Sequence, residues 1–256
     1  MDGAFQNCTS LQTLPAFPTS LKRMYGTFRN CTSLQTIPEF PPELQQLNEA
    51  FSSCTALVQV PSIPDNVWDL TSTFSGCTSL QAVTKLPQYI RSLDSTFKNC
   101  TSLQTAPNLP LNIELLNSTF ENCTSLRTLP NLPENIISMQ ATFRNCISLT
   151  GIIYIPESLH QYNDCFTGTV LPISLAGKSR ILSNILAAST AENLVIISEQ
   201  IAQNVIPEDC TYTIGDLVLL PGSYMPLYSA TGDTFVTDCP AVQHDLQSGQ
   251  AFGSHR

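Results

Sequence analysis

Charged residues are scarce in this sequence of 256 residues. They make up 12% of the chain, with 11 Lys and Arg against 20 Asp and Glu, whereas a typical soluble domain has ~25%. The net charge of −9 excludes nucleic acid and anionic membranes as the main partner, because both would repel the chain. The sequence also has no run of about 18 apolar residues, which excludes a membrane-spanning helix.

The groupings of side chains that enzymes and metal sites need are missing as well. No two cysteines lie closer than 19 residues, whereas zinc sites use close pairs such as Cys-x-x-Cys. Gly177-Lys178-Ser179 is similar to the end of a phosphate-binding loop, but Pro172 stands where that motif needs a glycine. No histidine has a cysteine or serine at a known catalytic spacing: His160, His244 and His255. We expect no catalytic residue, no metal and no cofactor.

What the sequence does contain is a repeat with a period of 23 residues, carried by seven of its ten cysteines and eight of its twelve phenylalanines. A fixed period of this length is the signature of a solenoid. The cysteines are Cys8, Cys31, Cys54, Cys77, Cys100, Cys123 and Cys146. The phenylalanines are Phe5, Phe28, Phe51, Phe74, Phe97, Phe120, Phe143 and Phe166.

Other positions of the repeat are equally regular. A leucine follows every repeat cysteine by three residues, and a proline follows it by ten. Stacked copies turn each such position into a ladder through the interior, so the sequence predicts an α/β repeat solenoid with a parallel β-ladder. The first strand is expected three to six residues after the cysteine, where proline ends it. A second is expected 13 to 19 residues after it, and the Thr-Phe-x-Asn-Cys-Thr-Ser segment is expected to form a corner.

The repeat cysteines are expected to be free, buried thiols. Neighbouring rungs of a parallel ladder lie about 4.8 Å apart with parallel side chains, which aims the sulfurs badly for a disulfide. Such thiols act as small apolar fillers. Cys210 and Cys239 lie outside the repeats and are candidates for a disulfide.

Residues 5–166 resemble the BspA-like leucine-rich repeats, the 23-residue class also known from Treponema pallidum, with the pattern Ala/Thr-Phe-x-x-Cys-x-x-Leu-x-x-Ile. The resemblance implies a right-handed coil that binds a ligand or a host surface through a curved sheet, without chemistry. The Leu-Pro-x-Leu-Pro segment at 129–133 is also similar to the repeats of type III secreted leucine-rich effectors. Those repeats are shorter and lack the Thr-Phe-x-Asn-Cys corner.

The regular pattern ends at Phe166, so residues 1–166 are predicted to be the solenoid. Helical spacing of apolar residues from 178 to 205 predicts a helical cap over 167–206, with two helices. Short strand-like runs separated by turns predict a small β-meander over 207–240, and 241–256 reads as a polar tail. The sequence opens inside a repeat, without a polar cap or an export signal, so we expect that it is a fragment.

Binding residues are expected in the columns that vary and that flank an apolar column. Positions 14 and 17 after the cysteine meet this description, and Tyr89 stands on a comparable column. Exposed aromatic residues are common binding anchors. The candidates are Tyr25, Trp68, Tyr89, Arg91 and Asp94. Ordinary packing between neighbouring coils is the alternative explanation for these aromatic residues.

The sequence thus predicts a non-enzymatic scaffold for a protein or glycan partner. Its resemblance points to part of a cell-surface adhesin of a host-associated microbe. The alternative is a secreted effector whose solenoid recognises a host protein. Five Asn-x-Ser/Thr sequons are present, of which four are by-products of the repeat; we interpret these as structural.

Overall fold

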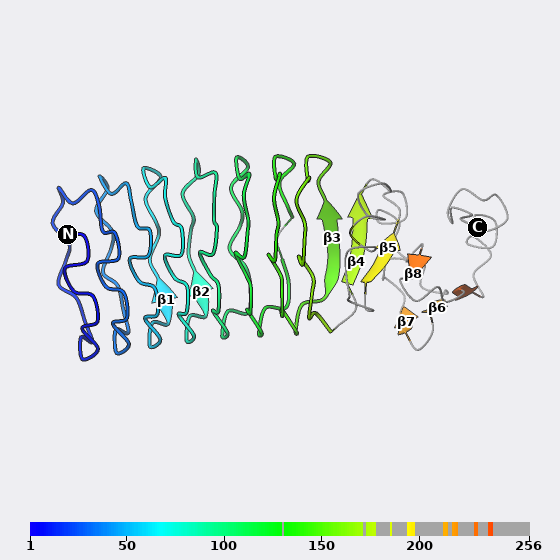
Figure 1. Ribbon diagram of the computed structural model, residues 1–256, viewed down its shortest axis with the longest axis horizontal. Coiled ribbons are helices and arrows are strands. Elements are labelled where there is room, and N and C mark those ends of the chain that lie inside the picture. Colours follow the sequence, from blue (N-terminus) through cyan, green and yellow to red (C-terminus); the bar gives the residue numbers. More distant parts are fainter. Residues whose placement is uncertain are drawn as a thin grey trace.

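The chain forms a stack of similar coils that follow one another along a single axis (Figure 1). The computed structural model describes residues 1–129, 131–170 and 173–177, then Ile185 and the short ranges 194–197, 212–214, 217–219, 228–229 and 235–237. Coil 1 begins at Cys8, coil 2 at Cys31, and so on to coil 7 at Cys146. We number each position by its offset from the coil's cysteine, so Trp68 is at position 14 of coil 3. Residues at the same position form a column.

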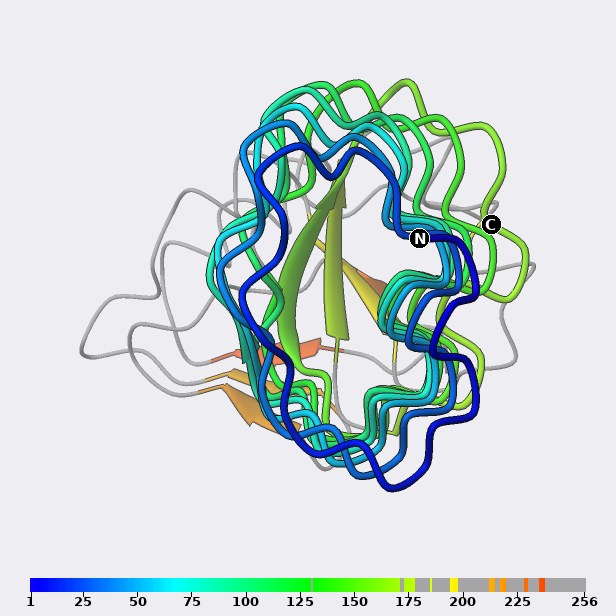
Figure 2. The same cartoon turned by 90° about the vertical axis from the view of Figure 1, so that its left-hand side faces the viewer.

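The core of the stack consists of the invariant apolar columns. Viewed along the axis, the coils lie nearly on top of one another (Figure 2). Phe28 to Phe166 of the repeat are buried, while Phe5 at the open N-terminal end is 40% exposed. The eight rings form one continuous stack with centroids 5.4 to 6.0 Å apart.

Proline ends two of the strands on the first side of the coil. The strands β1 (Gln59–Val60) and β2 (Ala82–Val83) pair in parallel at positions 5 and 6. Pro61 follows β1 directly and has no N–H to offer a neighbour, so the strand ends there. Ile153 replaces this proline in coil 7, where β3 (Gly151–Ile155) runs on until Pro156, whereas β2 ends before Thr84 without a proline.

The second side of the coil is less regular than the predicted strand at positions 13 to 19. Only position 15 forms parallel bridges, such as Arg23 with Gln46 and Leu115 with Ser138. From position 17 onward the chain instead makes consecutive turns. Two residues of each such segment have positive φ, for example Gly26 (54°) and Asn30 (60°), which an extended strand cannot include.

These turns hold neighbouring coils together at the predicted corner. The N–H groups of Met24, Gly26, Phe28 and Asn30 donate to carbonyls 22 residues ahead, in the next coil. The N–H groups between them close turns within the coil, as Thr27 N–H does to the Met24 carbonyl (3.3 Å). The same alternation recurs along the stack, so the corner is a hydrogen-bonded ladder made of turns.

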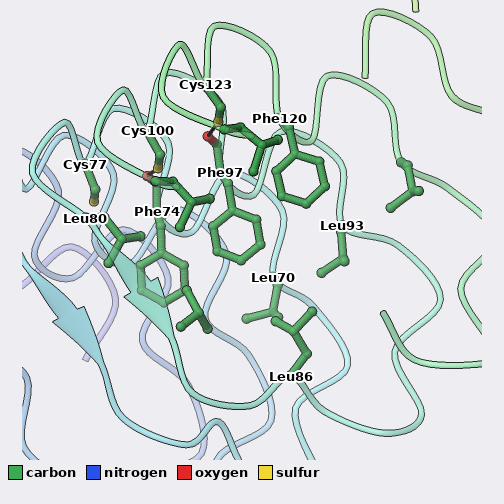
Figure 3. Packing of buried hydrophobic residues seen from close by; sticks show 14 of the residues in the cluster. Leu70, Phe74, Cys77, Leu80, Leu86, Leu93, Phe97, Cys100, Phe120 and Cys123 are labelled. Atoms are coloured by element: carbon green, nitrogen blue, oxygen red, sulfur yellow. Dashed lines mark hydrogen bonds between the residues drawn. The ribbon is translucent and has the colours of Figure 1, made fainter. Parts of the chain in front are cut away.

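The cysteines are more than apolar fillers, because each buried repeat thiol donates a hydrogen bond to a phenylalanine carbonyl 26 residues earlier in the chain. The Cys100 Sγ lies 3.1 Å from the Phe74 carbonyl oxygen, and Cys123 Sγ lies 3.1 Å from that of Phe97 (Figure 3). Six of the seven repeat cysteines are buried and free. The prediction of seven buried thiols is wrong for Cys8, which is exposed because no described coil precedes it.

The parallel ladder continues beyond the expected end of the solenoid at Phe166. β4 (Ile173–Gly177) pairs in parallel with β3, and β5 (Leu194–Ile197) pairs in parallel with β4. The predicted second helix is therefore wrong at Leu194–Ile197. These four residues are apolar and mostly β-branched, so pairing with an existing sheet edge competes well with a helix. Ile185 is helical and buried.

The last described strands are antiparallel. β8 (Tyr228–Ser229) pairs with β5, while β6 (Tyr212–Ile214) lies between β7 (Leu217–Leu219) and β9 (Phe235–Thr237). Short strands were predicted from the sequence at the positions of β6, β7, β8 and β9, but all four were expected in one meander. Cys210, Cys239 and the tail at 241–256 lie outside the described residues. In the described part of the chain, no helix has the length and apolarity needed to cross a membrane.

Candidate functional site

The candidate binding residues lie on the second side of the coil, where side chains alternate between core and solvent. Positions 13 and 16 point inward and are buried in coils 2 to 7, apart from a half-buried tyrosine at the last position 16. Position 14 lies between them and points outward. Its members are exposed in every coil except at Glu114, which is half-buried: Lys22, Gln45, Trp68, Arg91, Glu114, Ile137 and His160.

Two aromatic side chains stand out from this side in neighbouring coils. Trp68 of coil 3 is 59% exposed and Tyr89 of coil 4 is 66% exposed. We call the surface formed by Trp68, Tyr89, Arg91 and Glu114 the aromatic face. Packing between coils, the alternative explanation, does not account for side chains that leave more than half of their surface in solvent.

Tyr89 occupies a position that serves stacking in other coils. Position 12 holds asparagine in coils 3, 5 and 6, and in coils 3 and 6 these side chains bind the coil before them. The Asn66 amide donates to the Pro42 carbonyl (2.9 Å), and the Asn135 amide donates to the Leu111 carbonyl (3.0 Å). A phenol that projects into solvent cannot repeat this bond. Coil 4 thus lacks the side-chain contact that coils 3 and 6 make at this position, and exposes an aromatic ring there instead.

The hydrogen-bonded ladder is interrupted beneath the aromatic face. At position 14, the Trp68 N–H donates to the Gln45 carbonyl (3.0 Å) and the Glu114 N–H donates to the Arg91 carbonyl (2.8 Å). Among the described residues, no hydrogen bond joins the Arg91 N–H to the Trp68 carbonyl, and no bridge joins Asp69 to Ser92. From coil 1 to coil 7 of the described structure, this is the only pair of neighbouring coils that lacks the hydrogen bond between their position-14 residues.

Local hydrogen bonds form just after the interruption. The Asp69 carboxylate accepts the Thr71 N–H (3.0 Å), and the Ser92 hydroxyl accepts the Asp94 N–H (3.2 Å). Asp and Ser side chains commonly bind nearby backbone groups in this way. The Trp68 carbonyl and the Arg91 N–H take no part in these bonds and are left for solvent or a ligand.

Charges around the aromatic face are paired across coils. The Arg91 guanidinium contacts the Glu114 carboxylate (2.8 Å), and the Lys85 ammonium contacts the Asp65 carboxylate (3.0 Å). The Gln88 N–H and the Lys85 ammonium together lower the pKa of Asp65. The face presents donors and acceptors with little net charge, which is suited to a polar partner.

The five residues singled out in the sequence do not all lie together. Asp94 is half-buried, and its carboxylate accepts the Asn117 N–H of the next coil (2.9 Å), so it links coils. Tyr25, 47% exposed, belongs to coil 1 and lines a separate pocket of about 280 Å³ with Gly26, Arg29 and Glu49. Sequence reasoning did not single out Leu111 and Ile137, which are also exposed apolar residues of coils 5 and 6.

The buried thiols are unsuited to nucleophilic or metal chemistry. Burial raises the pKa of the Cys54 and Cys123 thiols to about 12, and it raises the pKa of Cys77 and Cys100 as well. A thiol must lose its proton to act as a nucleophile or a metal ligand. Within the described ranges, no group of three His, Cys, Asp or Glu side chains is placed to hold a metal ion.

Comparison with known families matches most of the described coils. The sequence model of a family described as "BspA type Leucine rich repeat region" matches residues 1–70 and 62–171, in six copies. No curated protein matches the chain.

Solved structures of bacterial leucine-rich repeat proteins are also similar to the chain. A leucine-rich repeat protein from Bacteroides ovatus is 18% identical over 79% of this chain and 67% of its own, with a TM-score of 0.47. One from Eubacterium ventriosum is 20% identical over 62% of this chain and 46% of its own, with a TM-score of 0.46. A leucine-rich cell surface protein from Faecalibacterium prausnitzii is 21% identical over 74% of this chain and 65% of its own, with a TM-score of 0.37.

Proposed function

Because the chain belongs to the family of BspA-type leucine-rich repeat proteins, we propose that it is a non-catalytic scaffold that binds a protein or glycan partner. The aromatic face, formed by Trp68, Tyr89, Arg91 and Glu114, is the proposed contact surface. Repeat solenoids commonly bind through extended surfaces of this kind. The proposed location is the surface of a host-associated microbial cell, where the protein would contribute to adhesion.

The observation that carries this proposal is the coincidence of exposed aromatic rings with the gap in the ladder. Trp68 and Tyr89 lie in columns that are mostly polar elsewhere, and they flank the unpaired Trp68 carbonyl and Arg91 N–H. Aromatic side chains contribute large contact areas to interfaces. Free backbone groups beside them supply the directional bonds that give a contact its specificity.

The proposal extends to the architecture. Parallel strands joined by a crossover are right-handed in nearly all proteins, so we propose a right-handed coil. Terminal segments of solenoids usually cover the open end of the core. On this basis we assign a capping role to the part of the chain after β5.

The binding test uses two exchanges for residues that already occur in the same columns. Trp68→Gln copies Gln45, and Tyr89→Asn copies Asn66, so both variants are expected to fold. We expect wild-type protein to bind at least one member of an array of immobilised glycans and purified cell-surface proteins. The double variant should bind that member at least tenfold more weakly in surface plasmon resonance.

A control variant lies on the other side of the coil. Gln81→Ala removes an exposed side chain at position 4 and should leave binding unchanged. Equal binding by wild type and the double variant would rule out the aromatic face as the contact surface. Because Trp68 is exposed, Trp68→Gln should change the free energy of unfolding by less than about 0.5 kcal/mol. A large loss of stability would mean that Trp68 supports the core.

A further inference from the structure

A second, smaller site lies at the other end of the solenoid from β5, beside Tyr25. A pocket of about 280 Å³ is lined by Asp2, Gly3, Gln6, Tyr25, Gly26, Arg29 and Glu49. This volume is close to the lower limit of ~300 Å³ for small-molecule sites. It fits a ligand the size of one ring. Coils 1 and 2 contain most of its lining, whereas the aromatic face belongs to coils 3 to 5.

The pocket exists because two glycines occupy position 18 at this end of the stack. Both have positive φ, 63° at Gly3 and 54° at Gly26. The backbone alone does not demand glycine, because the same column elsewhere holds other residues at φ 53° to 57°: Glu49, Ser72, Ser95, Ser118, Ala141 and Asp164. A Cβ atom on Gly26 would meet nothing within 4 Å. Glycine at this position therefore leaves open space that a side chain could fill.

One aromatic ring and two ion pairs surround that space. Tyr25 is 47% exposed, and the Asp2 carboxylate accepts its backbone N–H (3.2 Å). The Arg29 guanidinium donates to the Glu49 carboxylate (2.7 Å). Arg23 lies 3.8 Å from Asp2 on the rim. The Arg29–Glu49 pair is balanced within itself, whereas Asp2 faces Arg23 and also the Met1 ammonium, 3.9 Å away.

From this chemistry we infer that the pocket binds one ring of a neutral sugar. A hydroxyl group donates and accepts at once, so neighbouring hydroxyls can accept from Arg29 and donate to Glu49 without breaking the balance of charge. An anion or a cation would satisfy only one partner of the pair. The Tyr25 ring offers a flat apolar surface for the C–H face of a pyranose, while its hydroxyl stays in water.

The test is titration of the full chain with methyl glycosides of glucose, galactose, mannose and N-acetylglucosamine, followed by saturation-transfer NMR. We expect binding of at least one glycoside in the millimolar range. Tyr25→Thr copies Thr71 of the same column, and Gly26→Ser copies Ser72, so neither change should disturb the fold. Each variant should weaken binding at least tenfold, the first by removing the ring and the second by filling the space.

The controls separate this pocket from the aromatic face. The Trp68→Gln, Tyr89→Asn double variant should bind the glycoside as wild type does, whatever it does to the proposed macromolecular partner. Thermal melting of Tyr25→Thr and Gly26→Ser within a few degrees of wild type confirms that both are folded. The inference is overturned if no glycoside binds, if both variants bind unchanged, or if a neutral blocked peptide binds and the sugars do not.

Discussion

Single residues in this protein satisfy backbone groups as well as filling the core. At position 0 the cysteine thiol donates to a phenylalanine carbonyl 26 residues earlier, as Cys77 does to Phe51. At position 19 the threonine hydroxyl donates to a carbonyl at the same separation, as Thr96 does to Leu70 (2.9 Å). Both side chains are small, buried donors that bridge to an earlier coil. This dual requirement explains why neither column is occupied by larger apolar residues.

The phenylalanine stack yields a prediction at this scale. The Phe97 ring is fully buried between Phe74 (5.9 Å) and Phe120 (5.7 Å). Phe97→Ala should leave a cavity and lower the free energy of unfolding by about 3–5 kcal/mol. Urea unfolding followed by circular dichroism measures the loss. Phe5→Ala, at the exposed end of the same stack, is the matched control and should cost clearly less. Equal losses would contradict the packing described for Phe97.

Sequence reasoning predicted which residues enter the core but missed part of what they do there. Periodicity of apolar residues identifies a column as inward, because every copy has to fill the same place in the core. It carries no information on whether a thiol finds an acceptor, since the Phe51 carbonyl is 26 residues from Cys77 in the chain. The exposure of Cys8 was missed for a related reason, because burial of a repeat depends on the coil before it.

Among the elements, the corner made of turns is the most distinctive. Its position 22 carries an asparagine in most coils, with φ near 60°, as at Asn99 (62°) and Asn122 (61°). The Asn122 amide donates to Asn99 (2.6 Å) and accepts from the Asn145 amide (2.7 Å). Asparagine is thus favoured twice, by its tolerance of this backbone conformation and by its side-chain ladder.

Two substitutions of Asn122 separate these contributions. Asn122→Gly and Asn122→Ala both lose the amide ladder, but only alanine meets the cost of positive φ, about 1–2 kcal/mol. Glycine already stands in this column at Gly76, where φ is 76°. We therefore expect the alanine variant to be less stable than the glycine variant by about that amount in urea unfolding. The reverse order would show that the backbone at Asn122 is not held at positive φ.

Strand lengths could be anticipated from proline, whereas the continuation beyond Phe166 could not. Pro61 ends β1 and Pro156 ends β3, as the missing N–H of proline requires. After Phe166 the 23-residue spacing is lost, yet β4 and β5 still join the ladder. A short apolar run such as Leu194–Ile197 fits either a helix or a strand by pattern alone. In the folded chain this run forms a strand, because it pairs with the edge of β4.

At the scale of the whole molecule, the stack of thiols makes stability sensitive to alkali. Burial raises the folded-state pKa of the ladder thiols, to about 12 at Cys54 and Cys123, whereas an unfolded cysteine titrates near ~8.5. Stability is therefore fully present below the unfolded pKa and is lost as pH rises toward the folded value. Between the unfolded and the folded pKa, each such thiol should lower the free energy of unfolding by about 1.4 kcal/mol per pH unit.

Urea unfolding in the presence of reductant at pH 8 and pH 10 measures this dependence. We expect a loss of several kcal/mol between the two, because several thiols contribute. Cys100→Ala should be less stable than wild type at pH 8, yet its decline between the two pH values should be smaller by about one thiol's share. An unchanged decline in that variant would mean that Cys100 does not titrate on unfolding.

The candidate site shows where sequence reasoning reaches its limit for the molecule as a whole. The variable columns correctly indicated that Trp68 and Arg91 face outward. The gap beneath them, between the Trp68 carbonyl and the Arg91 N–H, becomes visible only when neighbouring coils are seen together. Similarly, the sequence alone suggests that Gly26 is an ordinary turn glycine. Comparison with the other coils shows that residues with side chains adopt the same positive φ in its column.

The direction of the hydrogen bonds between coils has a consequence for the history of the gene. At the corner, N–H groups point to the next coil, as Phe28 does to Ala50, whereas at position 14 they point back, as Gln45 does to Lys22. Most interior junctions therefore use the same set of donors and acceptors on both partners, although the junction between coils 3 and 4 lacks the bond at position 14. Unequal crossing-over that inserts or removes whole repeats preserves each junction, so the length of the stack can drift between lineages while its cross-section stays fixed.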